Sequence, residues 1–257
     1  MGLFDVFKKK GQPATIDQTP VRELYLGDLE KTQLIFELID VPRENRGEEW
    51  QKSFLENIVH ASFRCGDPQV ITGPDGFPYF QLFMPRPKER FQCYVIDRMK
   101  DDFLLKSGYG VVINPNDGQP DWVLSYGDIL NLHLTGSFYT TGPTLFSGAK
   151  EDETIRKDEK VLVGQPSEFV LPETARTILR QFLLNNGVKS PKVLLMSRNG
   201  GPGEEASQDL VFNLTPEAFE TEELFRSVTQ HLAWFLPRHY SFAALSEKQF
   251  SDCFMPL

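Results

Sequence analysis

Apolar residues recur at helical spacing in several stretches of the chain. The clearest set is Trp50, Phe54 and Ile58, which lie four residues apart and would share one face of an amphipathic helix. We expect Gly66 and Pro68 to stop this helix. The pattern as a whole predicts helices over 48–64, 95–107, 127–134, 172–185 and 222–235, and residues 246–249 have the form of a capping box before a last short helix.

Runs of apolar, β-branched and aromatic residues between turn formers predict the strands. The runs 69–72 and 77–83 flank Gly73-Pro-Asp-Gly76, a tight turn whose glycines tolerate positive φ, so we expect a β-hairpin there. Further strands are expected over 109–113, 121–125, 161–163, 193–197, 210–214 and 240–244. Since both halves mix helices with short strands, the predicted fold class is α+β (mixed α/β), with a small mixed sheet packed with helices in each half.

One internal stretch, 147–160, contains almost nothing apolar. Its charged composition is typical of a solvated linker, and we expect it to join two domains over 20–146 and 161–257. With 257 residues, 40% of them hydrophobic, the chain can bury a core in each domain. Residues 1–19 lack a hydrophobic period and are expected to form a flexible leader.

Charge and cysteine content narrow the range of partners and compartments. The net charge is −9 and neither half of the chain is basic, so nucleic acid is not an expected partner. The three cysteines are odd in number and widely spaced, which favours free thiols and a cytoplasmic location. The first ten residues place lysines after a short apolar stretch, the reverse of a signal peptide. No run approaches the ~20 apolar residues of a membrane span, so we expect no integral membrane segment.

Residues suited to catalysis or metal binding are few. No two of the four histidines are closely spaced, so we expect neither a metal site nor a cofactor. The stretch 123–127, Val-Leu-Ser-Tyr-Gly, matches half of a Gly-x-Ser-x-Gly nucleophile elbow, and Asp128 and His133 follow it. A serine hydrolase at Ser125 is therefore an alternative to a plain turn at this position.

A glycine-rich stretch over 198–205 could present backbone N–H groups to a phosphate. However, Glu204 and Glu205 stand where a phosphate-binding loop would carry Lys and Ser or Thr. We therefore expect a flexible hairpin loop here and no anion site.

Aromatic residues cluster late in the first half of the chain. Trp and Tyr supply rigid contact area at low entropic cost, and few lysines stand near them in this segment. We therefore predict a partner-binding surface formed by Trp122, Tyr126, Phe138 and Tyr139. Packing of the same side chains in the protein's own core is the alternative.

The second half of the chain resembles a known family. Residues 160–169, Lys-Val-Leu-Val-Gly-Gln-Pro-Ser-Glu-Phe, precede the helix at 172–185 and the strand Lys-Val-Leu-Leu-Met at 192–196. This order resembles the C-terminal domain of the bacterial SseB (enhanced serine sensitivity) family, and residues 75–83 are similar to a hairpin in its N-terminal domain. The resemblance implies an SseB-like α/β fold in both domains. The family has no established active site, so the resemblance implies no catalytic residue.

These observations favour binding over chemistry. We expect a non-catalytic cytoplasmic protein that acts as a protein-interaction or regulatory module, with another protein as its partner. A homo-oligomer, a small-ligand-binding protein and a serine hydrolase at Ser125 stay open as alternatives.

Overall fold

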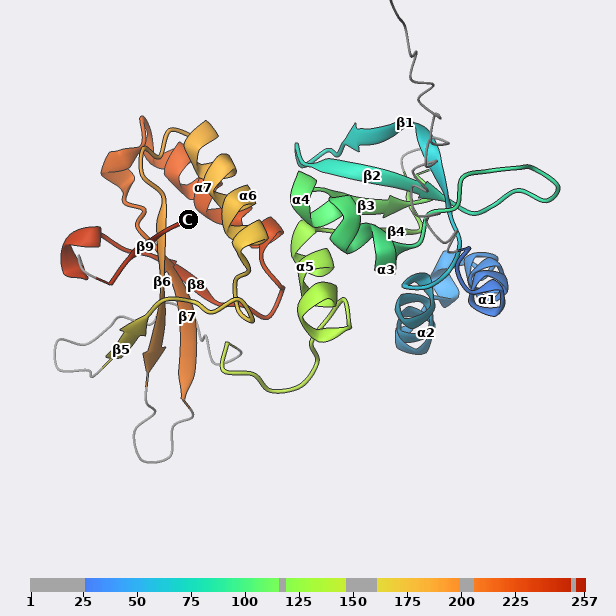
Figure 1. The fold of residues 1–257 in the computed structure, drawn as a ribbon, viewed down its shortest axis with the longest axis horizontal. Coiled ribbons are helices and arrows are strands. Elements are labelled where there is room, and N and C mark those ends of the chain that lie inside the picture. The colour runs from blue at the N-terminus through green and yellow to red at the C-terminus, as the bar shows by residue number, and fades with distance from the viewer. Residues whose placement is uncertain (1–25, 116–118, 147–160, 199–205, 251–252) are drawn as a thin grey trace, which may run out of the picture.

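The computed structural model of the protein describes residues 26–115, 119–146, 161–198, 206–250 and 253–257. It confirms the predicted α+β class, since each half of the chain forms a mixed sheet packed with helices (Figure 1). The first sheet has the order β1-β2-β3-β4, in which β2 and β3 are parallel and the other pairs are antiparallel. Its strands are β1 (Arg64–Thr72), β2 (Pro78–Phe83), β3 (Gly110–Ile113) and β4 (Trp122–Leu124).

The second sheet has five strands, of which β5 to β8 follow one another in sequence order. The last strand, β9, pairs with β6, and β7 and β8 are parallel. The strands are β5 (Val161–Gly164), β6 (Lys192–Arg198), β7 (Ser207–Phe212), β8 (Phe242–Ala244) and β9 (Met255–Pro256).

Helices fill the space between the two sheets and cover the outer end of the first one (Figure 1). The helices of the first half are α1 (Leu29–Ile39), α2 (Glu48–Ile58), α3 (Ile96–Met99), the π-helical turn η2 (Lys100–Leu104), α4 (Leu105–Ser107) and α5 (Tyr126–Thr135). Those of the second half are α6 (Glu173–Asn185) and α7 (Glu222–Phe235). Short 3₁₀ turns occur at Arg43–Asn45, Pro216–Ala218 and Glu247–Gln249. The two halves meet where α4 contacts α6 and α5 contacts α7.

The expected elements recur with two differences in the first half. The helix predicted over 48–64 ends at Ile58, and Gly66 and Pro68 belong to strand β1. The chain turns extended early because Phe63 is fully buried and pairs with Tyr94 in an antiparallel bridge. The other difference is α1, which the hydrophobic pattern did not predict. The expected leader at 1–19 and linker at 147–160 lie outside the described residues.

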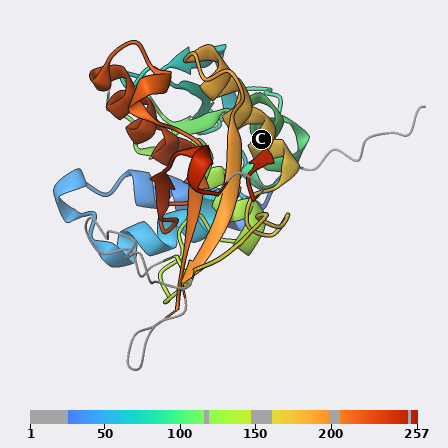
Figure 2. The ribbon, with the colours of Figure 1, turned by 90° about the vertical axis from the view of Figure 1, so that its left-hand side faces the viewer.

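Buried apolar side chains form a cluster that continues from one half into the other. It includes Leu82 and Ile113 of the first sheet, and also Leu183 and Phe212 of the second half. A smaller cluster around Met196 lies on the opposite face of the second sheet, where Phe254 covers it. Figure 2 shows this C-terminal segment in front of the strands. None of the described helices combines the length and the apolar character that a membrane crossing requires.

Candidate functional site

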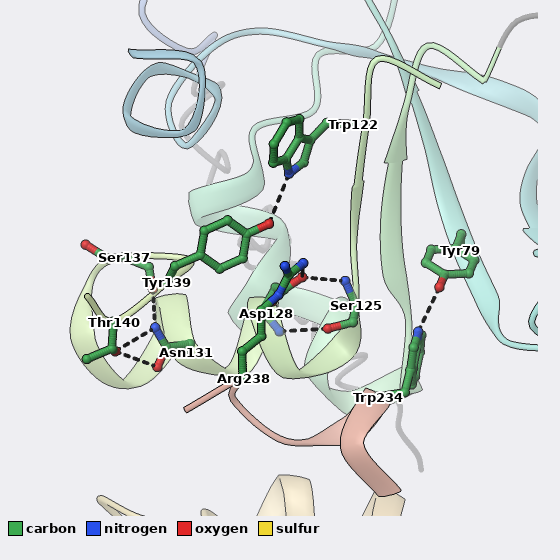
Figure 3. Close-up of polar contacts among 10 residues, drawn as sticks. All are labelled: Tyr79, Trp122, Ser125, Asp128, Asn131, Ser137, Tyr139, Thr140, Trp234 and Arg238. Carbon is green, nitrogen blue, oxygen red and sulfur yellow. Dashed lines mark hydrogen bonds and ion pairs between the residues drawn. The ribbon is translucent and has the colours of Figure 1, made fainter. Parts of the chain in front are cut away.

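Ser125 forms the N-terminal cap of α5. Its Oγ accepts a hydrogen bond from the Asp128 backbone N–H at 3.1 Å, and the Asp128 carboxylate accepts one from the Ser125 N–H at 2.9 Å (Figure 3). This reciprocal pair is a capping box, which satisfies two backbone donors at the helix start. His133 lies at the other end of α5, where its Nδ1 is 2.7 Å from Asp101 Oδ1. The three residues of the hydrolase hypothesis therefore do not form a Ser-His-Asp arrangement.

Asp128 also joins the two halves of the chain. The carboxylate is fully buried and accepts two hydrogen bonds from Arg238, at 2.7 and 2.9 Å (Figure 3). These hydrogen bonds raise the pKa of Arg238, and its guanidinium also lies 4.2 Å from the centre of the Tyr139 ring. A charged pair of this geometry fixes the orientation of both partners. Its role is to hold α5 against the segment that follows α7.

The predicted partner-binding residues contact mainly the chain's own core. Tyr126 and Phe138 are 0% and 3% exposed, so almost nothing of either side chain reaches the surface at which a partner would dock. Tyr126 packs against Trp234 and Phe235 from the other half, and its buried environment raises the pKa of its hydroxyl. Sequence reasoning could not separate a surface between proteins from a junction within one protein, because both favour large aromatic side chains.

Trp122 and Tyr139 are half-buried and contact each other. The Trp122 indole donates a hydrogen bond to Tyr139 Oη at 3.1 Å (Figure 3). On its other side, the indole ring lies 5.9 Å from the rings of Trp50 and Phe54, between centroids. Docking of a partner on Trp122 and Tyr139 stays a prediction, since part of each side chain reaches the surface.

We expect Trp122→Ala to lower the free energy of unfolding by about 3 kcal/mol, because it removes a large ring that packs against the stacked rings of Trp50 and Phe54. The matched control is Val123→Ala in the same strand, whose side chain is 40% exposed and whose replacement should cost under about 1 kcal/mol. Urea unfolding of both variants measures the difference. Equal and small costs for the two variants would show that Trp122 is a surface residue, as the docking hypothesis requires.

An open groove of about 880 Å³ lies next to β1, away from the predicted residues. Val70 of β1 and Phe80 of β2 line it on the side of the sheet. The helical segment 96–107 and its flanks contribute Met99, Phe103 and Tyr109. Two exposed apolar side chains, Leu26 and Phe91, also line the groove and are 61% and 40% exposed.

At the groove, β1 departs from regular pairing with β2. The register shifts between Cys65 and Val70, and the intervening residues bulge from the sheet. Gln69 in this bulge donates a hydrogen bond to Tyr94 Oη at 3.1 Å. Burial, together with the Cys65 thiol, raises the pKa of Tyr94 to about 12, so the phenol stays neutral near pH 7. The neutral phenol can therefore both donate and accept a hydrogen bond at the groove wall.

A second groove, of about 720 Å³, runs along α2 and includes Phe138 and Tyr139 in its wall. Its α2 side carries mainly charged and polar residues, namely Glu48, Gln51, Lys52 and Glu56. The groove next to β1 instead has two exposed apolar side chains, Leu26 and Phe91, beside an edge strand of the sheet. Exposed apolar side chains that gather at one place often mark a binding surface, so we take this groove as the candidate site.

The described residues offer little for metal or nucleophile chemistry. Within them, no three His, Cys, Asp or Glu side chains come close enough to hold a metal ion. All three cysteines are free thiols. The glycine-rich stretch 199–205 lies outside the described residues.

Comparison with models of known protein families, with characterised proteins and with solved structures finds no match for this chain.

The sequence analysis did not predict the residues of the groove next to β1 as a site. The available signal was Phe91, which stands alone in the polar stretch 85–92 and is not part of any helical or strand pattern. An isolated aromatic residue in such a stretch is weak evidence without the neighbouring strand.

Proposed function

We propose that this protein is a non-catalytic interaction module that binds an extended segment of a partner protein in the groove next to β1. The observation that carries the proposal is the combination of an edge strand with exposed apolar side chains at one groove. The regulatory role, the cytoplasmic location and the likeness to the SseB family are parts of the same proposal. They rest on sequence composition and on the motifs at 160–196.

The edge strand supports an extended partner over a helical one. In the described part of the chain, β1 pairs with β2 on one side, and only the Phe63–Tyr94 bridge precedes it on the other. An unpaired strand edge offers main-chain donors and acceptors to an added strand. Alternate side chains of such a peptide would then enter the apolar part of the groove, at Val70 and Phe80.

The roles already found for Ser125 and Asp128 also support binding over hydrolysis. A hydrolytic serine needs an adjacent base that accepts its proton. Here the Ser125 hydroxyl caps a helix, and the Asp128 carboxylate is engaged by Arg238. Both residues therefore have structural roles in the fold.

Selection from a display library of short random peptides, followed by titration of the selected sequences, tests the proposal. We expect the selected peptides to share apolar residues at alternate positions. Replacement of Phe91 by Glu should weaken their binding by about tenfold or more, which is ~1.4 kcal/mol, because a charge then replaces an apolar contact at the groove.

The control is Phe169→Glu, since Phe169 is 88% exposed and belongs to the second half of the chain. Both variants should retain the wild-type melting temperature, because neither side chain is buried. Peptides that bind Phe91→Glu as tightly as wild type, or a library that yields no binder, would refute the groove as a peptide site.

A further inference from the structure

A smaller cavity, of about 320 Å³, lies between the two halves of the chain. Its walls come from α4 and α5 of the first half and from the start of α6 in the second half. Most of the wall is apolar, and the residues concerned are Leu105, Tyr126, Leu130, Pro172 and Ala175. The volume of this cavity is near the lower end of the range for small-molecule sites, which is about 300–1,000 Å³.

The cavity is lined by one acidic residue, Asp101, and by two basic residues, Lys106 and His133. Asp101 binds His133 at 2.7 Å and Lys100 at 2.9 Å. Burial opposes the charge of Asp101, but the hydrogen bonds from Lys100 and His133 outweigh it and lower the pKa of that carboxyl. Lys106 lies one turn further on, and its Nζ contacts the Asp102 carbonyl oxygen at 3.3 Å. Among the described residues, Lys106 takes part in no ion pair.

The helical segment at this cavity has an unusual geometry. Residues Lys100–Leu104 form a π-helical turn, a feature that is rare and frequently occurs at functional sites. The turn contributes Asp101 to the cavity and Asp102 and Phe103 to the groove next to β1. One short segment therefore lines two separate sites.

We propose that the cavity binds a small molecule with an apolar body and one carboxylate. The body would lie against Leu105, Leu130 and Ala175, and the carboxylate would pair with the Lys106 ammonium. A cation is disfavoured because Lys106 and His133 both lie at the cavity, while Asp101 is already engaged. The proposal is independent of the peptide groove, since it uses different residues and a different ligand.

Three probes of one shape and different charge test this site: phenylacetate, the neutral phenylacetamide and the cation benzylamine. Ligand-observed NMR titration of the full-length protein should show phenylacetate binding about tenfold more tightly than the other two, because only its negative charge can form an ion pair with the Lys106 ammonium. Lys106→Gln should reduce phenylacetate binding to the level of phenylacetamide. Lys106 is exposed, so this variant should fold normally.

A second pair of variants locates the probe. Thr174 lines the cavity, and Thr174→Phe should fill it and abolish binding. Thr177→Phe, on the exposed face of the same helix, is the control and should bind phenylacetate as wild type does. Absence of phenylacetate binding at millimolar concentration, binding of phenylacetamide or benzylamine as tight as that of phenylacetate, or full binding by Thr174→Phe would each overturn the proposal.

Discussion

Gly127→Ala is expected to destabilise the protein by about 3 kcal/mol, near the upper end for overpacking of a buried site. Gly127 lies in the first turn of α5, and a Cβ atom there would be 1.9 Å from the Leu236 carbonyl oxygen and 2.4 Å from its carbon. Backbone atoms cannot move aside as the end of a long side chain can. The added methyl group must therefore push α5 away from the segment that follows α7.

The control for this variant is Gly164→Ala in β5. A Cβ at Gly164 would meet no atom within 4 Å, so its stability should change by less than about 0.5 kcal/mol. Denaturant unfolding gives the two free energies, and small-angle X-ray scattering shows whether the halves of Gly127→Ala have separated. A Gly127→Ala protein with wild-type stability and radius of gyration would contradict the close packing of the two halves.

The sequence predicted a helix or strand well where a local pattern of apolar residues and capping residues was enough to define it. The helix α7 matches its predicted range because its apolar stripe is long and Thr221 caps its start. The helix predicted over 95–107 is followed by Gly108, which adopts the left-handed conformation of a helix C-cap, with φ of 70°. In contrast, α1 was missed although Asp28 caps it. Its apolar residues are spread around the helix and form no single stripe at helical spacing, and they are Leu29, Leu34, Ile35, Phe36, Leu38 and Ile39.

The candidate site depends on long-range contacts, so the sequence could not predict it. The groove next to β1 lies where the register shifts after Cys65 and where Phe63 forms a bridge with Tyr94. Neither leaves a periodic signal in the chain. The junction of the halves could not be predicted either. Phe77 stacks on Trp234 with 4.2 Å between the ring centroids, although the two residues are 157 positions apart in the sequence. The aromatic residues that suggested an external partner serve partly at this internal junction.

Arg238→Met is expected to lower the free energy of unfolding by about 3 kcal/mol. Removal of one member of a buried ion pair typically costs about 3–5 kcal/mol, because the other charge is left buried without a partner. Here the carboxylate of Asp128 is 0% exposed, whereas the Arg238 side chain is 59% exposed. We expect the lower end of the range because water can reach part of the space that the guanidinium leaves.

Substitution of the other member of the pair, Asp128, should cost less. This difference between the two single variants is the sharper test. In Asp128→Asn the amide oxygen can still accept from the Ser125 N–H, and Arg238 can turn into water, so we expect a loss of about 1.5 kcal/mol. The double variant Arg238→Met with Asp128→Asn leaves no buried charge and should be more stable than Arg238→Met alone. Urea unfolding at neutral pH measures all three variants. If the losses of the two single variants simply add in the double variant, Asp128 and Arg238 act independently, and the ion pair does not hold the two halves together.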